Sequence, residues 1–173
     1  MVILIPLISC AEKERESEIY LLPDDYVGDF YIIYDVGSGE VPVYVGSTRL
    51  FELSETGMLH TQLTFNAGIG DSSMMRFFYV SEDGRKKEII ERYGSAIEDT
   101  EENRKDKRLY IMGGGFGTFG FTEETTARGC KYTHQHFYIG TLSDGLDSKG
   151  NFRFEDYYLE HGYLCDGQIF KVK

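Results

Sequence analysis

The chain has 173 residues, of which 41% are hydrophobic and 14% aromatic, which is enough to build one folded domain and excludes global disorder. The formal net charge is −11 and no basic cluster occurs, which excludes nucleic acid and an anionic membrane surface as direct electrostatic partners, because phosphate binding needs clustered Lys and Arg. The many Tyr and Phe residues and the 20 glycines favour strands and tight turns over helices.

The first ten residues are similar to the leader of a bacterial lipoprotein. Leu7-Ile8-Ser9-Cys10 fits the lipobox pattern, in which the cysteine thiol receives a diacylglyceryl group and the leader is cut just before that cysteine. The preceding apolar run contains Pro6 and lacks a basic residue, which a start of translation further upstream would explain. The sequence therefore predicts a truncated leader over residues 1–9, lipidation of Cys10 and a charged tether over residues 10–18.

A different interpretation of the same segment places residues 1–8 in a buried strand of a cytosolic domain, followed by a helix over residues 11–22. Residues 12–18 hold six charges in seven positions, which favours a solvated tether over a half-buried helix. The apolar run is too short to span a membrane as a helix, which takes about 20 residues. A membrane would therefore be reached only through a lipid anchor at Cys10.

From Ile19 onward, short β-branched and aromatic runs alternate with turn residues, which predicts a single mostly-β domain over residues 19–173. Gly37-Ser38-Gly39 is expected to form a hairpin turn, and Asp83-Gly84 is the strongest hairpin signal. The expected strands in the first half of the domain are residues 19–22, 29–35, 43–45, 49–53, 58–63 and 74–80.

The segment of residues 82–108 differs from the rest because it is strongly charged with mixed signs. Residues 86–97 could form a short amphipathic helix, which Gly94 interrupts. Residues 98–107 contain no aliphatic or aromatic side chain and are expected to be an exposed, mobile loop. The segment is therefore predicted to be a polar insertion in the domain.

The second half is expected to contain a strand at residues 108–112, a strand at 131–139, two helical turns at 155–161 and a closing strand at 168–172. Between the first two lies a glycine run that formally contains G-x-G-x-x-G from Gly115 to Gly120. A dinucleotide site would need this motif to open a helix, whereas the residues that follow are short and stopped by Gly129. We therefore interpret the run as an aromatic–glycine loop or bulged strand.

His134 and His136 lie two positions apart in an expected strand, so both imidazoles point to one face. A metal site would need a third ligand, for which His60 is a candidate. His161, Asp144 and Asp156 are also available, and the spacing selects none of the four. We expect this face to be an exposed polar sheet face without a metal, and we expect no cofactor.

Three cysteines are present, and their states depend on the compartment. If Cys10 is lipidated, Cys130 and Cys165 remain as a pair that could form a disulfide in an oxidising envelope. In a cytosolic chain all three would be reduced thiols.

The run from Ile19 to Asp35, together with residues 50–59 and 137–141, resembles an uncharacterised family of small bacterial proteins, many of them predicted lipoproteins. The likeness supports lipidation and brings no activity. The first half is also similar, more distantly, to prealbumin-type and carboxypeptidase-regulatory β-sandwiches. The expected fold is therefore mainly β, a β-sandwich of the prealbumin-like kind with one or two short helices and a charged loop insertion.

Three functions are compatible with these observations. The first is a non-enzymatic lipoprotein of the cell envelope that binds an unknown protein or small ligand. The second is a cytosolic acidic partner-binding protein, such as a toxin-neutralising immunity protein. The third is a hydrolase or metal-dependent enzyme that uses His60, His134 and His136. The fate of Cys10 distinguishes the first function from the second.

Overall fold

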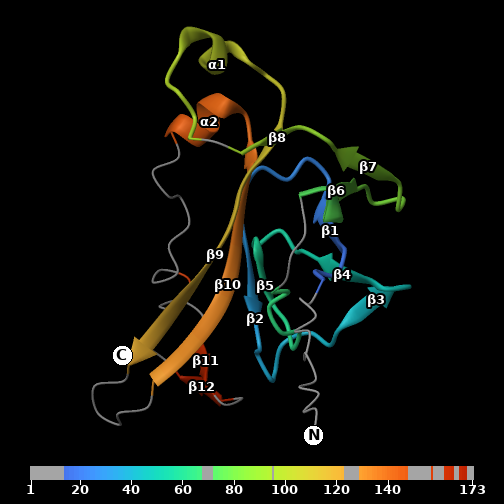
Figure 1. Ribbon diagram of the computed structural model, residues 1–173, viewed down its shortest axis with the longest axis vertical. Coiled ribbons are helices and arrows are strands. Elements are labelled where there is room, and N and C mark those ends of the chain that lie inside the picture. Colours follow the sequence, from blue (N-terminus) through green and yellow to red (C-terminus); the bar gives the residue numbers. More distant parts are fainter. Residues whose placement is uncertain are drawn as a thin grey trace, which may run out of the picture.

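The computed structural model describes residues 14–67, 72–94, 96–122, 129–147, 157, 162–165 and 168–170. Among these, the strand residues 119–122, 129–130, 163–165 and 168–170 are described by their backbone alone. Two five-stranded sheets face each other and enclose the core (Figure 1). The strand residues are mostly β-branched or aromatic, which suits a pleated surface buried on one side. The mainly-β sandwich expected from the sequence is confirmed.

The first sheet, which we call the β1 sheet after its central strand, has the order β3-β4-β1-β6-β7. β1 runs parallel to both of its neighbours, while β3–β4 and β6–β7 are antiparallel hairpins at the two edges. The strands are β3 (Val43–Val45), β4 (Thr48–Glu52), β1 (Glu18–Pro23), β6 (Met75–Val80) and β7 (Lys86–Ile89).

The second sheet, which we call the β10 sheet, has the order β5-β2-β10-β9-β8. Its hairpin β9–β10 is longer than the other strands and extends past the sandwich on the side away from β3 (Figure 1). The strands are β5 (Met58–His60), β2 (Gly28–Tyr34), β10 (Gly129–Gly140), β9 (Tyr110–Thr122) and β8 (Arg92–Tyr93). A separate two-stranded sheet pairs β11 (Tyr163–Cys165) with β12 (Gln168–Phe170), the latter inside the expected closing strand.

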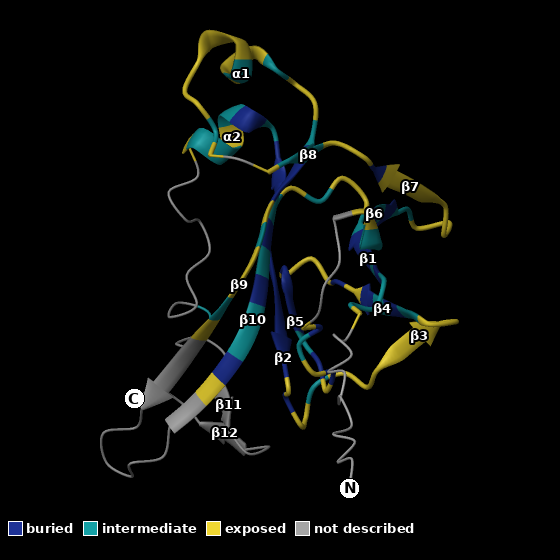
Figure 2. Ribbon diagram, viewed as in Figure 1, coloured by how far each residue is buried: buried dark blue, intermediate teal, exposed yellow. Residues whose placement is uncertain are grey.

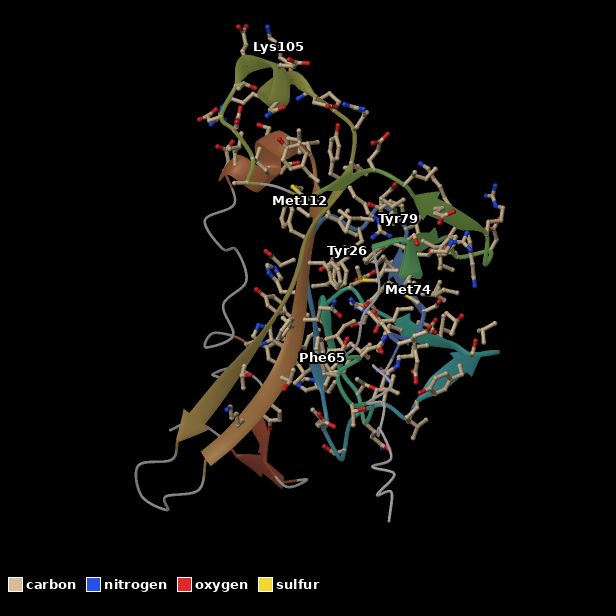
Figure 3. The ribbon with its side chains drawn as sticks, in the orientation of Figure 1. Tyr26, Phe65, Met74, Tyr79, Lys105 and Met112 are labelled. Atoms are coloured by element: carbon tan, nitrogen blue, oxygen red, sulfur yellow. The ribbon has the colours of Figure 1, made fainter. Side chains whose placement is uncertain are left out.

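Aromatic side chains from both sheets fill the space between them. Tyr20 stacks on Phe77 with ring centroids 4.5 Å apart, and Phe30 stacks on Phe137 at 5.0 Å. Each fully buried Phe contributes about 1.5–3 kcal/mol relative to an exposed one. Tyr26 and Phe65 pack against this core without being fully buried (Figure 3). The core is therefore the main source of stability, and it lies between β1 and β10.

The expected hairpin at Gly37-Ser38-Gly39 is wrong, although a turn is present there. The Gly39 N–H donates to the Val36 carbonyl at 2.8 Å, but β2 belongs to the β10 sheet and the next strand, β3, belongs to the β1 sheet. The N–H groups of Asp35 and Val36 donate to residues that follow β5, so the chain does not fold back onto β2. The turn thus carries the chain from one sheet to the other. By contrast, Asp83-Gly84 lies in the turn between the paired strands β6 and β7, as expected.

The interrupted amphipathic helix considered for residues 86–97 does not form, because this segment forms β7 and β8. β7 pairs with β6 and places Ile89 in the core, and β8 pairs with β9. Two strands that each complete a different sheet bury more apolar surface than one exposed helix would. Tertiary pairing therefore outweighs the local helical pattern.

The segment expected to be a loop, residues 98–107, contains a short helix, α1 (Glu101–Lys105), with no buried residue. Thr100 caps it by accepting a hydrogen bond from the Asn103 N–H at 3.2 Å. Arg104 bridges to Asp147 at 3.2 Å in the second short helix, α2 (Leu142–Asp147). The segment is exposed, as expected, but it has local helical order.

The glycine run lies in β9 and pairs with β10 along its length, with a register shift opposite His136 and Phe137. Gly113 and Gly114 have φ values of 85° and 92°, and a Cβ on Gly114 would lie 3.1 Å from the Phe137 ring. Only glycine adopts this backbone without strain next to a buried ring. The bulged-strand interpretation is confirmed. The helix expected at residues 155–161 lies outside the described residues except for Tyr157.

Candidate functional site

The three candidate histidines lie on one face, the outer face of the β10 sheet. In the strand register, His60 of β5 is opposite Ile33 of β2, and Ile33 is opposite His134 of β10. The fully buried Ile33 side chain therefore lies between His60 and His134, whose strands are about 10 Å apart at two inter-strand spacings. Within the described part of the chain, no three His, Cys, Asp or Glu side chains are grouped to hold a metal ion.

His136 is held by a carboxylate and a ring. Its Nε2 lies 2.6 Å from Asp29 Oδ1, and its ring stacks on Tyr31 at a centroid distance of 4.3 Å. Burial, and then the Asp29 charge, raises the pKa of Tyr31 to about 12. Burial and the nearby His136 lower the pKa of His134, and burial lowers the pKa of His60. A histidine oriented by a carboxylate can act as a base, but a phenol with a raised pKa is a poor nucleophile, so the described residues of this face do not form a complete catalytic set.

The cysteines are placed only in part. Cys10 lies outside the described residues, and Cys130 and Cys165 are described by backbone alone in β10 and β11. Lipidation of Cys10 and the Cys130–Cys165 disulfide therefore stay predictions. The G-x-G-x-x-G motif at Gly115–Gly120 stays in β9 and opens no helix there, so it does not have the geometry of a dinucleotide loop.

A buried polar network, which the sequence does not reveal, holds the start of the domain to both sheets. Glu18 is 1% exposed, and its Oε2 accepts hydrogen bonds from Arg15 at 2.7 Å and from the Tyr20 hydroxyl at 2.9 Å. Its Oε1 accepts from Asn66 Nδ2 at 3.0 Å. Burial is the main cause of the strongly raised pKa of Tyr20, followed by the nearby Tyr34 and Glu18.

The same network continues to Arg49 of β4 and Gln135 of β10. Arg49 is 3% exposed, forms an ion pair with Glu16 and donates to the Thr64 carbonyl at 2.7 Å. Gln135 Oε1 accepts from the Tyr34 hydroxyl at 2.9 Å. Because buried polar groups need partners, this set fixes the geometry of the β1 sheet beside β3. Its role is structural, since its members bond to one another inside the sandwich.

The β3 edge exposes apolar side chains. Val43, Tyr44 and Val45 are 47%, 45% and 59% exposed, and the preceding Val41 is 66% exposed. Figure 2 shows β3 as an exposed strand beside buried neighbours. None of the residues 41–45 is charged. We call residues 41–45 the β3 edge. The sequence signal is an apolar run without the polar alternation of a half-buried strand, although sequence alone does not show that this strand is at an edge.

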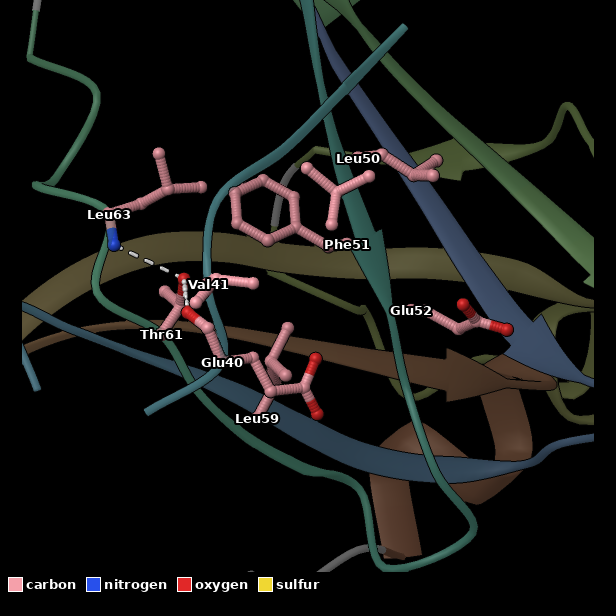
Figure 4. A pocket seen from close by; sticks show the side chains of 9 residues that line it. Glu40, Val41, Leu50, Phe51, Glu52, Leu59, Thr61 and Leu63 are labelled. Atoms are coloured by element: carbon pink, nitrogen blue, oxygen red, sulfur yellow. Dashed lines mark hydrogen bonds between the residues drawn. The ribbon is translucent and has the colours of Figure 1, made fainter. Parts of the chain in front are cut away.

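A small cavity of about 60 Å³ lies between the β3 edge, β4 and β5 (Figure 4). Its walls are mostly apolar, with Glu40 and Glu52 among the residues around it: Glu40, Val41, Val43, Leu50, Phe51, Glu52, Leu59, Thr61 and Leu63. The cavity exists because β3 pairs with β4 only as far as Leu50. The second half of β4 is therefore left uncovered on the side facing residue 41.

The opposite edge of the β1 sheet has a different character. β7 exposes Lys86, Lys87 and Glu88, and Glu88 forms a bidentate ion pair with Arg76 at 2.8 and 3.0 Å. A wide, shallow groove of about 330 Å³ adjoins it, with Ile90 among its lining residues. Its remaining lining combines the apolar side chains of Tyr79, Ile89 and Leu109 with charges of both signs, in Lys87, Glu88, Glu91 and Arg108. The β3 edge differs from this groove because none of its residues is charged.

Comparison with known proteins adds a family and a fold. Residues 14–145 match a family of unknown function, DUF6843, which confirms the resemblance to an uncharacterised family. No curated protein shows significant similarity to the chain. The crystal structure of a predicted lipoprotein from Bacillus anthracis is similar to this structure with a TM-score of 0.50 and 14% identity, over 83% of this chain and 88% of that one. In the described residues, no helix has the length and apolar character needed to cross a membrane.

Proposed function

This chain belongs to the DUF6843 family of unknown function, and we propose that it is a cell-envelope lipoprotein, anchored through Cys10, whose β-sandwich is an interaction module and not an enzyme. The observation that carries the anchor is the position of Cys10 relative to the domain. The family match begins at Glu14, four residues after Cys10, and the first strand begins at Glu18. A lipobox is expected in this position, directly before the folded domain.

A further observation supports the anchor over a buried strand at residues 1–8. The B. anthracis protein that shares this fold is itself a predicted lipoprotein. The competing proposal, a cytosolic partner-binding protein, requires a full-length and unmodified chain.

The β3 edge supports an interaction role. Apolar side chains that gather on one exposed strand mark contact sites in soluble domains, and an unpaired strand edge can pair with another strand. The histidine face supports catalysis less well, because Ile33 separates His60 from His134. The phenols beside His136 are also poor nucleophiles at neutral pH.

The test is fractionation of a bacterium that expresses the chain with its native upstream sequence. We expect the protein in the membrane fraction, labelled by an alkyne analogue of a fatty acid and with its N-terminus blocked at Cys10. Cys10→Ala should abolish labelling and release the protein, whereas the matched control Cys165→Ala should remain labelled. A soluble chain that keeps residues 1–9 and an unmodified Cys10 would contradict the proposal.

A further inference from the structure

We propose that the β3 edge binds the β3 edge of a second copy of this chain, in antiparallel orientation and with the two-fold axis at Tyr44. This inference rests on the interaction role proposed above and gives that role a partner. It does not require the lipid anchor. The contact would join two β1 sheets of five strands into one continuous sheet across the dimer.

The backbone of β3 is oriented for such a contact. Val45 and Thr48 close the two-residue turn Gly46-Ser47, so they form the hydrogen-bonded pair of the hairpin. Hydrogen-bonded and non-hydrogen-bonded pairs alternate along antiparallel strands. Tyr44, opposite Arg49, is therefore a non-hydrogen-bonded position, and its N–H and C=O point to the free edge. Among the described strands none pairs with this edge.

The side chains are self-complementary, as a two-fold contact requires. With Tyr44 on the axis, Tyr44 lies opposite its own copy and Val43 lies opposite Val45 of the second copy. Further out, Pro42 lies opposite Gly46 and offers only its C=O, Val41 lies opposite Ser47, and Glu40 lies opposite Thr48 and not opposite an acid. Over residues 43–45 the register thus pairs apolar with apolar side chains, and it brings no carboxylates together, although the chain carries a net charge of −11.

Charge favours a second copy on this edge and not on the other. A β7–β7 contact with its two-fold axis at Lys87 would place Lys87 opposite its own copy, which disfavours association, although Lys86 would then lie opposite Glu88. The β3 contact is small compared with the about 1,200–2,000 Å² that a stable interface buries. We therefore expect a weak dimer in solution that becomes populated when both copies are confined to one membrane surface.

Disulfide trapping tests the register. Chains carrying Cys10→Ala, Cys130→Ser and Cys165→Ser receive one new cysteine, either Val43→Cys or Val45→Cys, and one of the two bears a size tag. In the proposed register, residues 43 and 45 of different copies have Cα atoms about 4.5 Å apart, within reach of a disulfide. Residue 43 and its own copy are about 8 Å apart, which is out of reach. Tyr44→Cys pairs with itself at about 5.5 Å.

We expect the mixture of Val43→Cys and Val45→Cys chains to give about tenfold more cross-linked dimer than either chain alone, because only the unlike pair is within reach. Tyr44→Cys alone should also cross-link. Equal yields from the mixture and the single variants, or no dimer from any of them, would overturn the proposal. If the cysteine-free background does not fold, the same comparison is made with Cys130 and Cys165 retained, and the yield without an introduced cysteine is the baseline. Since these chains are not lipidated, this result is independent of the Cys10 fractionation test.

Discussion

The two edges of the β1 sheet are built alike but protected differently. Each is a hairpin with a glycine of positive φ in its turn, Gly46 at 64° and Gly84 at 79°. β7 exposes charged side chains, and Glu88 is paired with Arg76, whereas β3 exposes only valine and tyrosine. Proteins commonly use charge to keep strand edges from pairing with other chains. The β3 edge is protected only by its short length and by Pro42, which lacks an N–H, and the absence of charge there supports the proposed contact.

The interior behind the two edges differs as well. Arg49, opposite Tyr44 of β3, is 3% exposed and belongs to the buried network, whereas the Arg76 side chain beside β7 is 53% exposed. The β3 side is thus held rigid from within and left apolar outside. A rigid edge loses less conformational entropy when it pairs, which favours binding.

The largest effect is expected from the buried arginine. Arg49→Ala removes a buried ion-pair partner and the donor to the Thr64 carbonyl, and should lower the free energy of unfolding by about 3 kcal/mol. Arg76→Ala at the charged edge removes an exposed pair and should change the free energy of unfolding much less. Urea denaturation of both variants measures the difference. Equal losses would mean that the network does not stabilise the β3 side.

A smaller effect is expected from the two turn glycines. A Cβ at Gly46 or Gly84 meets no atom within 4 Å, so alanine at either position carries only the strain of a positive φ. Each substitution should cost about 1 kcal/mol. If β3 mediates association, Gly46→Ala should reduce disulfide trapping through Tyr44→Cys, and Gly84→Ala should not. Thermal melts and trapping yields of the two variants separate stability from association.

The charged edge can be converted to resemble the apolar one. Replacing Lys86, Lys87 and Glu88 with Val, Tyr and Val should change the free energy of unfolding little, because these side chains are exposed. The new edge should nevertheless self-associate, which light scattering would detect as a rise in average mass. A variant that remains as monodisperse as the parent chain would show that charge does not protect this edge.

The smallest effect concerns the charged segment that contains α1. None of the α1 residues is buried, and its ion pairs, such as Lys105 with Glu101, are exposed. Replacing residues 98–107 with a short Gly/Ser linker should therefore barely change the melting temperature, because exposed pairs contribute little and loop-closure entropy changes slowly with length. A drop of more than about 8 °C would show that the segment packs on the core.

The contrast also explains what the sequence predicts and what it does not. The strands are predictable because runs such as Phe30 to Tyr34 combine β-branched and aromatic residues between turn signals. The sheet to which each strand belongs is not predictable, because the turns after β2 and β4 look locally like hairpin turns but connect strands of different sheets. Residues 86–97 have a helical pattern, but pairing with β6 and β9 makes them strands.

The candidate sites show the same division. Sequence periodicity places His134 and His136 on one face, but only the register shows Ile33 between His134 and His60. The run from Glu12 to Glu18 has the composition of a solvated tether, whereas Glu18 is buried. One partner of Glu18 is Asn66, 48 positions away, and another is Tyr20, which in turn donates to Gln135, 115 positions from Tyr20. The exposure of β3 depends on its edge position, which tertiary pairing decides.

Amide hydrogen exchange of the β3 edge in two states of the protein tests the proposed β3–β3 contact most directly. One state is the Cys10→Ala chain, dilute in solution, and the other is the lipidated chain reconstituted at high density on phospholipid vesicles. We expect the Tyr44 amide to exchange freely in solution and to exchange at least about tenfold more slowly on vesicles, with no change in the amides of β7. A Tyr44 amide that exchanges at the same rate in both states, or equal protection of β3 and β7, would contradict the proposed contact.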